Sequence, residues 1–66
     1  MSDELSEYYR MATESELDLA EAYLTQKRKA AAQEALLEAR YWFMKCKGED
    51  LQPLQNRITN LEKTLY

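Results

Sequence analysis

The sequence contains no histidine, and its 66 residues include only one cysteine, one glycine and one proline. Without histidine and with a single thiol, the chain lacks the side chains that usually bind zinc or iron, and it cannot form an internal disulfide. Histidine is also the commonest general acid–base residue in enzymes. We therefore expect no metal, no cofactor, no small-molecule substrate and no catalytic activity.

Valine is absent as well, and isoleucine occurs once. The abundant residues are Ala, Leu, Glu, Lys, Arg and Gln, all of which favour helix by intrinsic propensity. Hydrophobic residues make up 45% of the chain and charged residues 32%, which is too apolar for a disordered chain. The sequence predicts an all-α fold, with residues 1–66 forming a single small helical domain. A domain of this size buries only about 60% of its unfolded surface, so packing against a partner is expected to stabilise it.

The chain begins with the acidic segment Met-Ser-Asp-Glu, and no hydrophobic stretch follows it. We therefore expect no signal peptide, and no apolar run reaches the roughly 18 to 20 residues that a membrane span needs. A lone free cysteine agrees with a reducing compartment. These features predict a cytoplasmic protein.

The strongest interruption of the helical pattern is the segment from Lys47 to Pro53. Gly48 suits the left-handed position after a helix, Asp50 suits an N-cap, and Pro53 suits a first helical turn. We expect a tight turn at Gly48 between a long helix and a shorter C-terminal helix. Apolar residues at spacings of three and four on both sides of this turn predict an antiparallel helical hairpin of residues 32–65. Its core is predicted to contain Leu36, Phe43, Leu51, Leu54, Ile58, Leu61 and Leu65.

The N-terminal third allows two arrangements. Thr13 and Glu16 have the spacing of a capping box, which would end a short first helix near Ala12 and let it fold back as a third helix. No glycine, proline or asparagine supports that break, so one helix from about Asp3 to Lys47 fits equally well. Such a helix would be about 67 Å long and could not bury itself.

A second apolar stripe runs along the long helical segment, and the predicted hairpin is too short to cover it. Tyr, Trp and Met are enriched in protein interfaces, so we expect this stripe to bind another protein or a second copy of the chain. The leading function is a non-enzymatic interaction module, such as a small adaptor, co-chaperone or regulator, which acts as a homodimer. The residues predicted to bind the partner are Leu5, Tyr9, Leu19, Tyr23, Leu37, Tyr41, Trp42 and Met44.

Charge suggests one alternative. Residues 1–25 have a net charge of −6, residues 26–47 of +4 and residues 48–66 of −1. The basic run Lys27-Arg28-Lys29, with Arg40 and Lys47, could serve a small nucleic-acid-associated protein. Consecutive helical residues point about 100° apart, however, and the net charge of −3 opposes this function, so nucleic acid is the less favoured partner.

Three other groups have a structural interpretation that outweighs a functional one. The pairs Glu14/Asp18 and Glu34/Glu38 share helix faces, and such pairs are usually solvated surface charge. Cys46 lies on the hairpin stripe between two lysines, which could activate its thiol, but a helix C-terminus opposes a thiolate. We expect Cys46 to be a small core residue.

Overall fold

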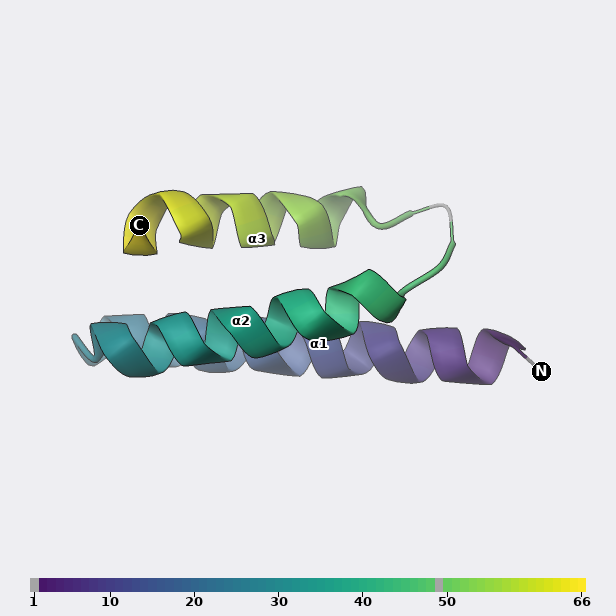
Figure 1. The fold of residues 1–66 in the computed structure, drawn as a ribbon, viewed down its shortest axis with the longest axis horizontal. Helices are drawn as coiled ribbons and strands as arrows, with labels where there is room; N and C mark the ends of the chain where they lie inside the picture. Colours follow the sequence, from purple (N-terminus) through teal and green to yellow (C-terminus); the bar gives the residue numbers. More distant parts are fainter. Residues whose placement is uncertain (1, 49) are drawn as a thin grey trace.

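The chain forms three helices, seen in a computed structural model that describes residues 2–48 and 50–66, with side chains from Leu5 onward. They are α1 (Ser2–Thr25), α2 (Lys29–Lys45) and α3 (Gln52–Leu65), shown in Figure 1. The described residues contain no strand. The predicted all-α class is therefore confirmed.

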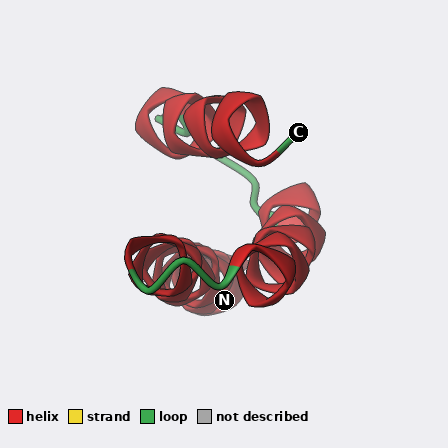
Figure 2. Ribbon diagram, turned by 90° about the vertical axis from the view of Figure 1, so that its left-hand side faces the viewer, coloured by secondary structure: helices red, strands yellow, loops and turns green. Residues whose placement is uncertain are grey.

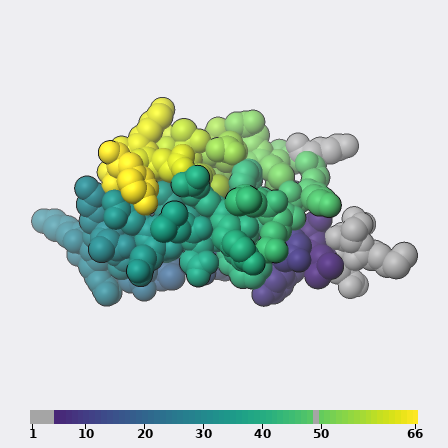
Figure 3. Space-filling model, viewed as in Figure 1, coloured from purple at the N-terminus to yellow at the C-terminus, as the bar shows by residue number. Residues whose placement is uncertain are grey.

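The helices form two layers. Helices α1 and α2 run antiparallel and share the most extensive contact, whereas α3 lies across one face of that pair (Figures 1 and 2). The bundle measures 40 × 16 × 14 Å, and the space-filling view in Figure 3 shows α3 lying along α2. Because α3 covers one face of the α1–α2 pair only, the opposite face has no helix of the described chain over it.

The predicted helix from about Asp3 to Lys47 is wrong, because the chain reverses at residues 26–28. The reversal is a Schellman motif: the Lys27 amide donates to Leu24 at 2.9 Å and the Arg28 amide donates to Tyr23 at 2.8 Å. Lys27 takes the left-handed conformation, with φ of 60°, that this motif requires. Lysine pays a steric cost there that glycine avoids, so the turn depends on the packing of the two helices it joins.

The alternative break near Ala12 is wrong as well, since α1 continues through this region without interruption. Thr13 is fully buried, and its hydroxyl donates to the Tyr9 carbonyl at 2.8 Å instead of capping a new helix. The chain does fold back on itself, but the first helix is much longer than the capping box predicts.

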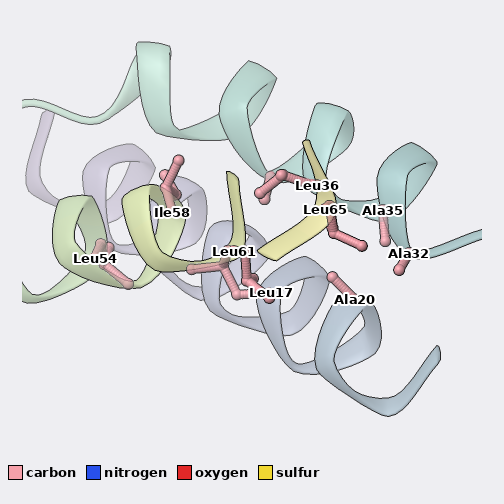
Figure 4. Close-up of a cluster of buried hydrophobic side chains, with 10 residues drawn as sticks. Leu17, Ala20, Ala32, Ala35, Leu36, Leu54, Ile58, Leu61 and Leu65 are labelled. Carbon is pink, nitrogen blue, oxygen red and sulfur yellow. The ribbon is translucent and has the colours of Figure 1, made fainter. Parts of the chain in front are cut away.

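The core lies where the three helices meet, and Figure 4 shows its side chains converging from all of them. Helix α1 contributes Leu17 and Ala20 to the core, and the small side chain of Ala20 lets α2 approach closely. Alanines dominate the α2 side and leucines the α3 side. The remaining buried members are Ala32, Ala35, Leu36, Ala39, Leu54, Ile58, Leu61 and Leu65.

The predicted hairpin core takes part in this cluster, although α1 also contributes to it. Five of the seven predicted residues are buried: Leu36, Leu54, Ile58, Leu61 and Leu65. The other two, Phe43 and Leu51, are partly buried and pack against the cluster.

Polar contacts hold α3 on the other two helices. The Gln33 amide donates to the Leu65 carbonyl at 2.9 Å, and Arg40 pairs with Glu62 at 3.4 Å, so α3 runs antiparallel to α2. On the α1 side, the Arg57 guanidinium lies 2.7 Å from Asp18 and 3.2 Å from Glu21. The hydrogen bond to Asp18 is the main cause that raises the pKa of Arg57 above its ordinary value.

The connection between α2 and α3 spans residues 46–51 and differs in detail from the tight turn predicted there. Cys46 is the C-cap of α2, and Gly48 follows with a φ of 142°, which favours glycine. Leu51, not Asp50, is the N-cap of α3, and no side chain caps the helix. Pro53 lies in the first turn, where its missing amide hydrogen is harmless.

Candidate protein-interaction surface

The residues predicted to bind a partner lie mostly at the surface of the α1–α2 pair. Leu5, Leu19, Leu37, Tyr41 and Met44 are 42% to 82% exposed. Tyr9, Tyr23 and Trp42 are half-buried between the two helices or at their edge. We call the side of the α1–α2 pair away from α3 the open face.

An open groove runs along this face where α1 and α2 meet. It has a volume of about 670 Å³ and an apolar floor of Leu19, Tyr23, Ala31 and Ala35. The reason for its position is helical geometry: Leu17 and Leu19 are two residues apart, so they point about 200° apart around α1. Burial of Leu17 in the core therefore leaves Leu19 in the groove. The remaining lining residues are Glu16, Arg28, Glu34, Leu37 and Glu38.

A cluster of four aromatic rings occupies the end of the α1–α2 pair where α1 begins and α2 ends. The Trp42 ring lies at the centre, 6.0 Å from Tyr9 in a stacked arrangement, 5.9 Å from Tyr8 and 5.2 Å from Tyr41 in edge-on arrangements. Ring pairs of this geometry contribute roughly 0.5 to 1.5 kcal/mol beyond the area they bury. The cluster joins the two helices and still leaves Tyr8 and Tyr41 more than half exposed.

Two cations lie over aromatic rings at opposite ends of the helix pair. The Arg28 guanidinium is 4.9 Å from the centre of the Tyr23 ring, and the Lys45 ammonium is 5.0 Å from that of Tyr41 and 5.9 Å from that of Tyr9. Contacts of this kind at exposed sites contribute about 0.5 to 1 kcal/mol. They hold both side chains close to the helices that form the open face.

The carboxylates of the groove differ from those beside α3. Among the described residues, every ion pair includes a residue of α3, and none includes Glu16, Glu34 or Glu38. The groove therefore presents apolar side chains flanked by three carboxylates. A partner that brings a lysine or an arginine would find these carboxylates available for pairing.

The structure separates the bases of the nucleic-acid alternative. Lys27, Arg28 and Lys29 lie at the turn between α1 and α2, whereas Lys47 lies beyond the far end of α2, about 25 Å away by the length of that helix. Arg40 pairs with Glu62, and Arg28 lies on Tyr23. These bases do not gather into one basic patch.

The other groups singled out in the sequence have structural partners or remain at the surface. Asp18 accepts the hydrogen bond from Arg57, and Glu14 is exposed. Cys46 is half-buried; its sulfur lies 3.5 Å from the Trp42 carbonyl and 3.8 Å from the Thr13 hydroxyl. Within the described residues, no cluster of three or more His, Cys, Asp or Glu side chains is arranged to hold a metal ion.

Sequence reasoning missed two residues of the open face. Ala31 and Ala35 both line the groove. Ala31 belongs to the three-alanine run of residues 30–32 and Ala35 follows that run by three residues, and their small side chains gave no signal. Only the reversal at residues 26–28 makes them neighbours of Leu19 and Tyr23.

Across the described residues, no helix combines the length and the apolar character needed to span a membrane. No protein-family model matches the chain, and no curated protein or solved structure is significantly similar to it.

Proposed function

We propose that the chain is a non-enzymatic protein–protein interaction module, a small cytoplasmic adaptor, co-chaperone or regulator, that acts as a homodimer through its open face. The supporting observation is the exposure of large apolar side chains along that face. Leu19, Leu37 and Tyr41 are all at least 42% exposed, next to a groove with an apolar floor. Contiguous exposed apolar surface of this kind marks interaction sites in soluble proteins.

The proposal includes the predicted pairing of residues 32–46 with residues 51–65 as the scaffold that keeps this face in place. Helix α3 covers the opposite side of α2, where Leu36 and Leu65 are buried. Helices α1 and α2 are thereby held side by side while their outer face stays available. The nucleic-acid alternative ranks second, because its bases lie at separate ends of α2.

Sedimentation of the unmodified protein and of two matched variants tests the proposal. Leu37→Glu places a charge in the open face and is expected to shift the protein toward monomer with unchanged helicity, because Leu37 is already 53% exposed. Tyr66→Glu places the same charge at a large side chain that follows α3 and is 71% exposed, and is expected to have no effect. A stable monomer for the unmodified protein at all concentrations would contradict the homodimer.

A further inference from the structure

One row of side chains on α2 has a charge pattern that would bring opposite charges together if two copies of the row lay side by side in opposite directions. Glu34, Glu38, Tyr41 and Lys45 follow at spacings of four, three and four residues, so they share one side of the helix. All four are exposed, and two of them line the open groove. The row reads acid, acid, phenol, base, and its two ends are about 16 Å apart along the helix axis.

The facing row on α1 is apolar at both ends. It runs from Leu5 and Tyr9 at one end to Leu19 and Tyr23 at the other, and Ala12 and Glu16 continue the spacing of three and four residues between them. The contact of Tyr9 with Trp42 and that of Tyr23 with Arg28 set the level of α1 against α2. They place the middle of the α1 row level with the middle of the α2 row, within about one helical turn.

From this shared level we infer that the open face takes a second copy of the chain in antiparallel orientation, related by a two-fold axis across the middle of both rows. The inference rests on the self-association in the proposed function and specifies its geometry. The axis brings Lys45 of each copy opposite Glu34 of the other, and Tyr41 opposite Glu38. Along α1 it lays the apolar row of one copy against the reversed row of the other, so that the Leu5 end of each row lies near the Leu19 and Tyr23 end of its partner.

Charge disfavours the parallel arrangement of the same two faces. A two-fold axis along the helices would place α2 of each copy over α1 of the other, so Glu34 would come near Glu16 and Lys45 near Leu5, and no carboxylate would face a base. The antiparallel arrangement instead offers two ion pairs and two carboxylate–phenol contacts. The Lys45 ammonium already lies over the Tyr41 ring, and its three donors still allow it to bind a carboxylate from the second copy.

The dimensions of the bundle set the expected strength. A face 40 Å long and 16 Å wide offers on the order of 600 Å², somewhat less than the roughly 800 Å² that each partner contributes to a standard interface. The dimer is therefore expected to be weak, with a dissociation constant in the micromolar range. Its affinity should fall as ionic strength rises, because the ion pairs lie at the rim.

Charge reversal distinguishes this geometry from other modes of self-association. Glu34→Lys and Lys45→Glu, each alone, are expected to weaken the dimer about tenfold, since each loses both symmetry-related pairs and creates repulsion. The double variant restores the pairs in reversed order and is expected to recover the original affinity. The two residues are too far apart on one helix for this recovery to arise within a single chain. Sedimentation equilibrium measures all four dissociation constants.

Two controls separate the pairing from general charge effects. Glu34→Lys brings the net charge closer to zero, which by itself would favour association, so a weakened dimer has the opposite sign. Glu14→Lys makes the same change in net charge at an exposed residue of α1 that the groove does not include, and is expected to leave the affinity unchanged. Circular dichroism checks that every variant keeps its helices.

A zero-length carbodiimide cross-link gives an independent readout on the unmodified protein. In a mixture of isotope-labelled and unlabelled chains, mass spectrometry is expected to find Lys45 joined to Glu34 between copies. A dimer whose double variant stays weak, or which lacks this cross-link, would overturn the antiparallel geometry and leave the proposed function standing. A monomer at every concentration would overturn both.

Discussion

Replacement of Leu17 by alanine tests how α1 packs, because this side chain is fully buried at the junction of the three helices. Its matched control is Leu19→Ala, the same substitution two residues further along α1, where the side chain is 42% exposed in the open groove. The two variants have the same composition and nearly the same helix propensity. They differ only in the side of α1 that loses its leucine.

The expected difference is large for a chain of this length. Replacing a buried leucine with alanine costs about 2.7 to 5 kcal/mol, because the removed atoms leave a cavity. A 66-residue domain has a total stability of about 3 to 10 kcal/mol. In small domains each kcal/mol lowers the melting temperature by about 4 to 8 °C, so Leu17→Ala should lower it by at least about 10 °C. Leu19→Ala should cost less than about 1 kcal/mol.

Thermal unfolding followed by circular dichroism measures both effects. The melts should be recorded at a low protein concentration, where the monomer predominates, and again at a high one. At high concentration a dimer stabilises the folded state by mass action, so Leu19→Ala should lose part of the concentration-dependent rise in melting temperature that the unmodified protein shows. Leu17→Ala should be less stable at both concentrations.

Equal melting temperatures for the two variants at low concentration would refute the assignment of α1 faces. So would a larger loss for Leu19→Ala than for Leu17→Ala. Either result would mean that α1 does not bury Leu17 against α2 and α3, as it would not if α1 extended away from the other helices.

Two further changes test the contacts that join the helices. Arg57→Gln removes the ion pairs with Asp18 and Glu21, which are partly exposed, so it should cost at most about 1 kcal/mol in dilute buffer and almost nothing in 1 M salt, as measured by urea unfolding. The raised pKa of Arg57 means that its contribution persists from neutral pH up to the ordinary arginine value and is lost only in strong alkali. A loss attributable to Arg57 between pH 6 and pH 9 would contradict this. Lys27→Gly should stabilise the fold by about 0.5 to 1 kcal/mol by relieving the left-handed backbone, whereas Gly48→Ala should destabilise it by a similar amount although its added methyl group meets no neighbour. A melting temperature that falls for Lys27→Gly would show that the lysine side chain matters more than its backbone.

The helical character of the chain could be predicted, because each helix buries residues with a helical period. The stripe Leu54, Ile58, Leu61 and Leu65 was visible in the sequence, and all four residues are buried. This prediction needs no knowledge of the other helices, since burial of one side of a helix leaves the same pattern whatever covers it. Helix α3 is therefore the part of the fold that local information determines best.

The reversal at residues 26–28 could not be predicted from turn chemistry. The left-handed position of a Schellman motif usually holds glycine or asparagine, and here it holds Lys27. Thr13 and Glu16 offered a better local signal at the wrong place, and the burial of Thr13 in the core overrides its capping tendency. The only sequence feature near the true break was the shift of the apolar face around the helix between Leu24 and Leu36. Such a shift indicates that the two halves of the segment pack against different neighbours, but it does not indicate that the chain turns.

The open face was nevertheless predicted at mostly the same residues, for a reason that does not depend on where α1 ends. In the predicted hairpin, Leu19 and Leu37 had no cover because too little chain remained to reach them. In the structure α1 does fold onto α2, but it does so through Leu17 and Ala20, which lie on a different side of α1 from Leu19. Since α1 has apolar side chains on two sides and can bury only one of them against α2 and α3, the other side stays open in both arrangements. The sequence pattern of α1 itself therefore leaves this side for the partner that we propose, and the second copy is the candidate whose charges fit it.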